Sequence, residues 1–152
     1  MELLYAMWNN LIIRTALFGW FVAQFLKVVV DICKSGTFDI KRFIGGSGGM
    51  PSSHTSLVVS TCIAVLEREG PYSSTFALSV VLAGVVMYDA IGVRRAAGEH
   101  ARMINALVDE WDWSNPALMG TRLKELLGHT PLEVCAGAVV GVIVGLVMNP
   151  PF

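Results

Sequence analysis

Four apolar segments constrain this chain more than any other feature of its sequence. They cover residues 11–30, 51–66, 75–93 and 131–148, and the first could begin as early as Leu3. A helix needs about 20 mostly apolar residues to cross a bilayer. The pattern therefore predicts an all-α integral membrane bundle with four transmembrane helices.

The composition favours the same class of protein. Hydrophobic residues make up 54% of the chain and charged residues only 15%, against about 25% in soluble domains. A net charge of -1 with no basic block excludes nucleic acid as an expected partner. The length of 152 residues allows about one domain, so we expect a single membrane domain over residues 1–152 in contact with membrane lipids.

A fifth helix is expected in the connection formed by residues 94–130. Four apolar residues recur there at helical spacing: Ile104, Leu107, Val108 and Trp111. This spacing predicts an amphipathic helix that lies on the membrane surface or against the bundle. Trp111 and Trp113 would suit the membrane interface.

The last apolar segment contains the glycine run Gly137, Gly141 and Gly145. Small residues four apart let another helix approach closely. The partner helix could belong to the same bundle or to a second copy in a homodimer.

Lysine and arginine residues are distributed unequally between the two ends of the apolar segments. Nine of them fall on the side of the two long connections: Lys27, Lys34, Lys41, Arg42, Arg94, Arg95, Arg102, Arg122 and Lys124. The other side has Arg14 and Arg68. The positive-inside rule predicts a multi-pass protein of the cell membrane with both long connections in the cytoplasm and both termini outside.

Polar residues at the start of the second segment form the first candidate site. Pro51 marks a helix start that follows a glycine-rich loop. The N-terminus of a helix attracts anions, and Ser52, Ser53 and His54 add side-chain donors to it. The alternative is an ordinary serine cap on a membrane helix.

The start of the fourth segment holds the second candidate group. Pro131 again marks a helix start, and His129 and Glu133 are four residues apart. A carboxylate on one imidazole nitrogen raises the basicity of the other, which suits a nucleophile or general base. A helix-capping pair is the alternative interpretation.

The third group comprises Asp89, Arg94, Arg95 and Glu99. A carboxylate inside an apolar segment is costly unless it is paired, so we expect Asp89 to hold an arginine. Arginine matches phosphate oxygens with a planar fork, although two arginines at a helix end also serve as topology signals. All three groups lie on the predicted cytoplasmic side and favour phosphoryl chemistry by a covalent route. No sequence pattern indicates a metal, and we expect no cofactor.

At these residues the chain resembles the divergent branch of the type 2 phosphatidic acid phosphatase superfamily, which includes vanadium haloperoxidases. The resemblance rests on GGMPSSHTSLVVS, MYDAIGVRRAAGEHARMINAL and GHTPLEVCAGAVVG, with the stretch Gln24–Lys27, and covers most of the chain. The superfamily motifs are K-x6-R-P, P-S-G-H and S-R-x5-H-x3-D. In that family the last histidine attacks phosphorus and the P-S-G-H histidine protonates the leaving oxygen.

The resemblance implies roles for individual residues. Pro51–His54 matches P-S-G-H with Ser53 in place of glycine, and His129–Glu133 matches H-x3-D with glutamate in place of aspartate. Arg94 also stands six residues before His100, but His100 lacks an acid four residues later. The family arginine is therefore Arg94 or Arg95, separated from His129 by an insertion at about residues 96–127. Lys27 matches the first motif, although no R-P follows it, and Arg42 could substitute.

The implied activity is hydrolysis of a phosphate monoester or pyrophosphate on a lipid, without metal. His129 would be the nucleophile, Glu133 would orient it and His54 would be the general acid. Six residues would bind or organise the phosphate: Ser52, Ser53, Arg94, Arg95, Lys27 and Asp89. Two alternatives remain: a non-catalytic membrane protein that binds lipid headgroups or anions, and a carrier of a phosphorylated lipid or anion.

Overall fold

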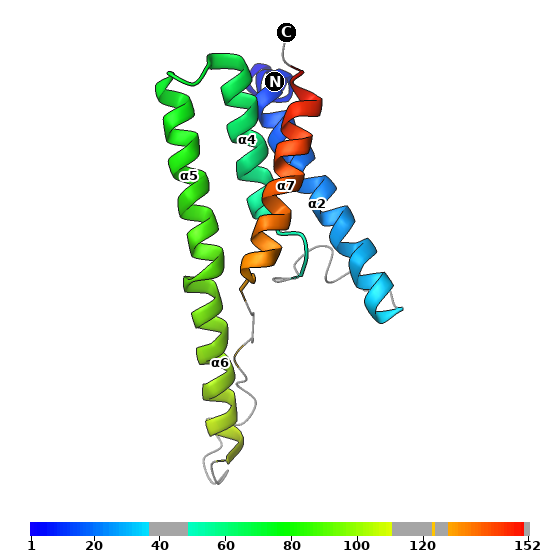
Figure 1. The fold of residues 1–152 in the computed structure, drawn as a ribbon, viewed down its shortest axis with the longest axis vertical. Coiled ribbons are helices and arrows are strands. Elements are labelled where there is room, and N and C mark those ends of the chain that lie inside the picture. The colour runs from blue at the N-terminus through cyan, green and yellow to red at the C-terminus, as the bar shows by residue number, and fades with distance from the viewer. Residues whose placement is uncertain (37–48, 111–122, 124–127, 151–152) are drawn as a thin grey trace.

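The computed structural model describes residues 1–36, 49–110, 123 and 128–150, and most of these residues lie in α-helices. The helices are α1 (Glu2–Asn9), α2 (Leu11–Ser35), α4 (Ser53–Glu69), α5 (Ser74–Ile91), α6 (Val93–Glu110) and α7 (Pro131–Met148) (Figure 1). The all-α class is confirmed for this part of the chain, and each predicted apolar segment corresponds to a helix.

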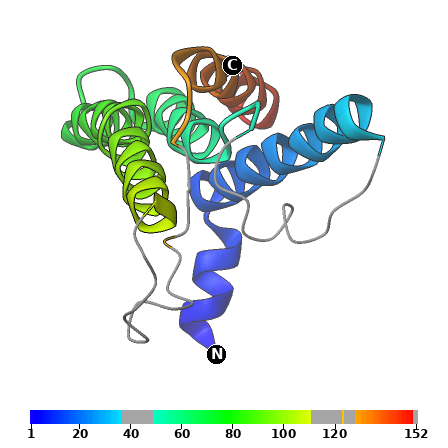
Figure 2. The ribbon, with the colours of Figure 1, turned by 90° about the horizontal axis from the view of Figure 1, so that it is seen from below.

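Helix α4 lies at the centre of the bundle, with α2, α7 and α5 packed around it (Figure 2). Its hydroxyl side chains face these neighbours, and Ser52, Thr55, Ser56 and Ser60 are fully buried. The Ser56 hydroxyl donates to the backbone carbonyl of Gly19 on α2 at 2.8 Å. Short polar side chains that bond to a neighbouring backbone allow helices in an apolar bundle to approach closely.

The glycine run of α7 packs against α4 within the same chain. A Cβ at Gly137 would overlap the carbonyl of Ser52, and one at Gly141 would lie 2.8 Å from the carbonyl oxygen of Ser56. A Cβ at Gly145 would lie 2.5 Å from that of Ile63. The run is therefore the surface that brings the first turn of α7 to the first turn of α4.

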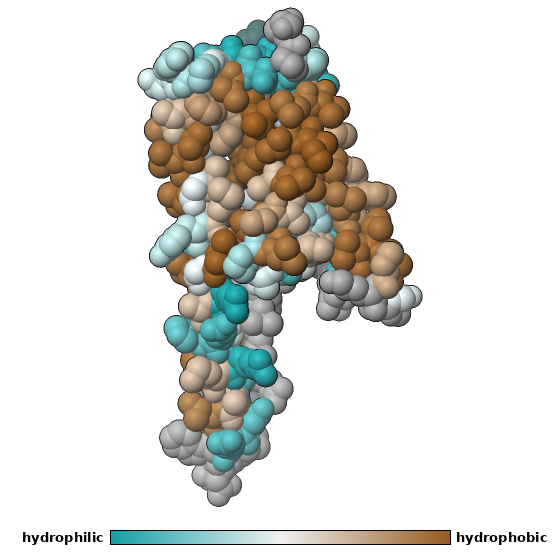
Figure 3. All heavy atoms as spheres, in the orientation of Figure 1, coloured by the Kyte–Doolittle hydropathy of each residue, from teal (hydrophilic) through white to brown (hydrophobic). Residues whose placement is uncertain are grey.

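Within the part of the chain that the structure describes, three helical stretches are long and apolar enough to cross a membrane, namely Leu11–Cys33, Ser74–Glu110 and Pro131–Met148. Their apolar side chains form a continuous outer belt on the visible face (Figure 3), and on α5 Leu78, Val81 and Val85 are exposed. Apolar surface of this extent is expected where lipid replaces water. The protein is a helical membrane protein.

Two sequence-based expectations about helix ends are wrong. The first span does not extend back to Leu3, because the Asn10 side chain accepts hydrogen bonds from the N–H groups of Ile12 and Ile13 and begins α2. The amphipathic helix does not turn onto the bundle, since α6 continues the line of α5 away from it (Figure 1). Trp111 and Trp113 lie outside the described residues.

Candidate active site at the start of two helices

The first turns of α4 and α7 are joined directly. The backbone N–H of Ser52 donates to the carbonyl oxygen of Glu133 at 3.0 Å. The Ser52 hydroxyl accepts from the backbone N–H and from the hydroxyl of Thr55, at 3.4 and 3.0 Å. Ser52 is therefore the N-cap of α4, and the first-turn N–H groups that follow it, those of Ser53 and His54, are the backbone donors available to an anion.

His129 and Glu133 meet as the sequence predicts. His129 Nδ1 lies 3.2 Å from Glu133 Oε2, and the His129 side chain is buried. The same oxygen accepts the backbone N–H of Thr130 at 2.9 Å, while the Thr130 hydroxyl accepts the N–H of Glu133 at 3.3 Å. Glu133 therefore caps α7 and orients His129 at the same time, because its side chain is long enough to reach both the Thr130 N–H and the imidazole.

Contact with the α5–α6 junction fixes the backbone of the His129 segment. The N–H of His129 donates to the carbonyl oxygen of Ala90 at 3.1 Å. A Cβ at Gly128 would lie 2.8 Å from that same oxygen and would overlap the backbone nitrogen of Arg95. The sequence analysis did not predict this contact with the α5–α6 junction. Its one indication in the sequence is Gly128, the glycine directly before His129.

The two arginines differ in their surroundings. Arg94 Nε lies 2.6 Å from Asp89 Oδ2, which confirms the expected pairing of Asp89. Arg95 Nε instead lies 3.3 Å from Glu99 Oε1 on the next turn of α6. Of the two arginines, Arg94 is the one whose charge acts on both histidine rings, those of His54 and His129.

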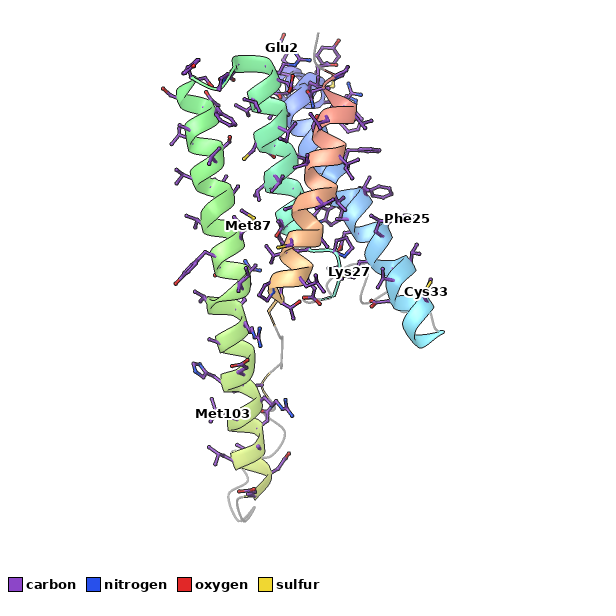
Figure 4. The ribbon with its side chains drawn as sticks, in the orientation of Figure 1. Glu2, Phe25, Lys27, Cys33, Met87 and Met103 are labelled. Carbon is purple, nitrogen blue, oxygen red and sulfur yellow. The ribbon has the colours of Figure 1, made fainter. Side chains whose placement is uncertain are left out.

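Lys27 comes to the site from α2. It is only 4% exposed and lies close enough to Glu133 for the two charges to interact. Gly49, at φ 87°, passes over the lysine stem, and a Cβ there would contact Lys27 Cγ at 3.5 Å. Figure 4 shows Lys27 beside the segment that leads into α4. Arg42, the alternative cation, lies outside the described residues.

His54, in the first turn of α4, and His129, directly before the N-cap of α7, are close enough for their charges to interact. The His54 ring is exposed at the first turn of α4 and interacts electrostatically with His129 and Lys27. Burial lowers the pKa of His129 below the ordinary value of 6.5, the hydrogen bond to Glu133 raises it, and the charges of Lys27 and Arg94 lower it again. The net result is a pKa below the ordinary value, which favours the neutral imidazole.

The sequence matches the divergent PAP2 family over residues 8–144. The chain belongs to the divergent PAP2 family. It is 37% identical over 158 residues to the uncharacterized membrane protein YuiD of Bacillus subtilis (strain 168), and the alignment covers 97% of each chain. No solved structure matches it. Membership in this family accords with the helix starts and histidines described above.

Proposed function

We propose that this divergent PAP2 protein hydrolyses a phosphate monoester or pyrophosphate on a membrane lipid through a phosphohistidine. The observation that carries the proposal is the backbone hydrogen bond from Ser52 to Glu133, which joins the helix starts beside His54 and His129. The charges of Arg94 and Lys27 act on both rings. Two imidazoles and two cations around first-turn N–H groups suit a phosphate in which one bond to phosphorus forms as another breaks.

In the proposed reaction His129 Nε2 attacks phosphorus. Nδ1 faces Glu133 Oε2, so that the carboxylate holds the proton on Nδ1 and leaves the Nε2 lone pair free. The bond between phosphorus and the lipid oxygen breaks, and His54 gives its proton to that oxygen. His54 then takes a proton from water, whose oxygen attacks phosphorus and releases phosphate and neutral His129.

The cations would carry the charge of the phosphate. Arg94 is aimed by Asp89, and the buried Lys27 supplies a fixed positive charge. The N–H groups of Ser53 and His54 would add donors to the oxygens, while Ser52 would act by holding this turn in place. Arg95 would have a smaller role, since it pairs with Glu99.

The depth of the site favours a lipid substrate. Helix α2 continues from Lys27 to Ser35, a rise of about 12 Å at 1.5 Å per residue. On and near this stretch Phe25, Val29 and Ile32 are exposed, and Phe25 points away from the bundle (Figure 4). A phosphate at Lys27 would then lie beside apolar surface, where a headgroup meets its acyl chains.

We infer that α4 is a fourth transmembrane helix, although it is less apolar than the other three. Its neighbours α2, α5 and α7 shield it, so its hydroxyl groups need not face lipid. The distribution of lysine and arginine supports a cytoplasmic position for the site and an external position for the ends of the chain.

The test is phosphate release by the purified full-length protein in lipid nanodiscs, with phosphatidate and a polyprenyl pyrophosphate as substrates. We expect H129A to abolish release and H54A to reduce it strongly. His100 is exposed on α6, so H100A serves as the control and should match the unmodified protein. Full release by H129A would refute the nucleophile, and vanadate binding without turnover of any lipid would favour the non-catalytic alternative.

A further inference from the structure

Asn105 makes a two-point contact with a distant part of the chain. Its Nδ2 donates to the carbonyl oxygen of Leu123 at 2.9 Å, and its Oδ1 accepts the backbone N–H of Leu123 at 3.0 Å. Asn105 is 5% exposed, although it lies on α6, where Met103 and Leu107 are largely exposed. A polar side chain buried on an otherwise open helix has a specific partner to satisfy.

The buried side of α6 consists of small residues. Gly98 and Ala101 precede Asn105 by seven and four residues and share its face of the helix, and all three are buried. Small side chains permit a backbone to lie against a helix. Leu123 bonds to Asn105 on this face.

Gly128 and His129 are also held in place by backbone contacts. Gly128 packs against the backbone of the α5–α6 junction, and the N–H of His129 bonds to the carbonyl oxygen of Ala90. Residues 124–128 are all that separates Leu123 from His129. Fixing Leu123 on α6 therefore limits where His129 can lie relative to Arg94.

We propose that Asn105 is a positioning residue for His129, acting through the backbone of Leu123. Its relevance to turnover rests on the proposed role of His129 as the nucleophile. No feature of the sequence predicts this role, because an asparagine in an exposed amphipathic helix is expected to be solvated like the other polar residues of that helix.

The chemistry of the contact explains the choice of residue. A primary amide both donates and accepts, as the C=O and N–H of one backbone residue require. Aspartate keeps the acceptor but would face the Leu123 carbonyl with a negative charge. Leucine has a similar shape and neither function, whereas glutamine keeps both functions on a longer stem.

The experiment measures the rate at which diethyl pyrocarbonate modifies each histidine of the full-length protein in detergent, by mass spectrometry. In the unmodified protein we expect His129 to react slowly, because it is buried, and His54 and His100 to react faster because both are exposed. N105L should speed modification of His129 about tenfold, since two hydrogen bonds that resist local opening are lost. The rates of His54 and His100 should stay unchanged.

N105D should give an intermediate rate at His129 and N105Q a rate close to that of the unmodified protein. R102A, an exposed position on the same helix, is the control and should change no rate. An unchanged His129 rate in folded N105L would overturn the proposal, as would equal acceleration of all three histidines. If N105L does not fold, the test is the comparison of His129 modification rates in N105D and N105Q. Equal rates in these two variants would overturn the proposal.

The histidine rates are independent of the proposed phosphatase activity. If the unmodified protein releases no phosphate, the proposed function fails while the rate at His129 still tests Asn105. If it is active, N105L should lower kcat much more than it raises KM, because the nucleophile is displaced while the phosphate-binding groups stay in place. A change confined to KM would contradict the positioning role.

Discussion

The backbone N–H of Ser52 donates a 3.0 Å hydrogen bond to the carbonyl oxygen of Glu133, joining the first turns of α4 and α7. The contact is possible because Gly137, one turn further along α7, has no side chain to keep the Ser52 backbone away. Through it the N-cap residue two before His54 is tied to the residue that holds His129. The helix starts next to the two histidines are therefore joined, although they lie far apart in the sequence.

The Glu133 carboxylate sets both the orientation and the proton affinity of His129. Its hydrogen bond and charge raise the His129 pKa, while burial lowers it. We expect E133Q to shift the acid limb of the kcat/KM profile to lower pH. The substitution removes the carboxylate that raises the His129 pKa, so His129 stays neutral in more acid solution. In the unmodified protein this limb should already lie below 6.5, the ordinary pKa of histidine.

The rate of E133Q on its plateau should fall by up to about 10⁴-fold, because an amide no longer holds the reacting histidine in the correct tautomer. The pH–rate profile with a lipid phosphate provides the measurement. A limb that moves to higher pH in E133Q would contradict the assignment of that limb to His129.

The role of His54 as general acid predicts a dependence on the leaving group. For a lipid phosphate, whose alkoxide needs a proton, H54Q should lower kcat/KM, which reports formation of the phosphohistidine, by about 10²- to 10⁴-fold. For nitrophenyl phosphate the loss in kcat/KM should be much smaller, because nitrophenolate leaves without a proton and the later attack of water does not enter kcat/KM. Equal losses on both substrates would show that His54 acts in some other way, and H100Q should leave both rates unchanged.

The neighbouring arginines provide a matched pair of variants. Arg94 is held by Asp89 near the two histidines, and Arg95 is held by Glu99 on α6. We expect R94A to lower kcat/KM at least about tenfold, the effect of losing a charged hydrogen bond. R95A removes an exposed ion pair and should change kcat/KM little. A larger loss of kcat/KM in R95A than in R94A would reverse the assignment of the phosphate-binding arginine.

Stability should respond differently to alanine at two glycines. A Cβ at Gly141 would lie 2.8 Å from both the Ser56 carbonyl oxygen and the Val59 Cβ, whereas a Cβ at Gly84 on α5 would meet nothing within 4 Å. Crowding in a packed interface costs about 1–3 kcal/mol, and the better helix propensity of alanine offsets up to about 1 kcal/mol of it. G141A should therefore lower the thermal unfolding midpoint in detergent.

G84A is the control for this comparison, because it changes the same residue type inside another apolar helix. Its midpoint should be unchanged or slightly higher, since alanine only adds helix propensity there. A midpoint for G141A equal to that of G84A would mean that α7 does not pack on α4 along the glycine run.

The amino-acid sequence by itself determined the class of fold and the residue types of the site. Apolar segments of membrane-spanning length, Pro51 and Pro131 at two helix starts, and the spacing of His129 and Glu133 are local features, and local geometry is enough to interpret them. The pairing of Asp89 with an arginine followed from the cost of an unpaired carboxylate in an apolar segment.

Only the tertiary structure decided which distant groups meet. It pairs Arg94 with Asp89 and Arg95 with Glu99, turns the glycine run inward against α4, and continues α6 along the line of α5. It also connects Asn105 to Leu123 and His129 to Ala90. Both of these last contacts end on backbone groups that are distant in the chain, and backbone N–H and C=O groups are the same at every residue. Their partners depend on how the helices pack, which no local pattern of side chains records.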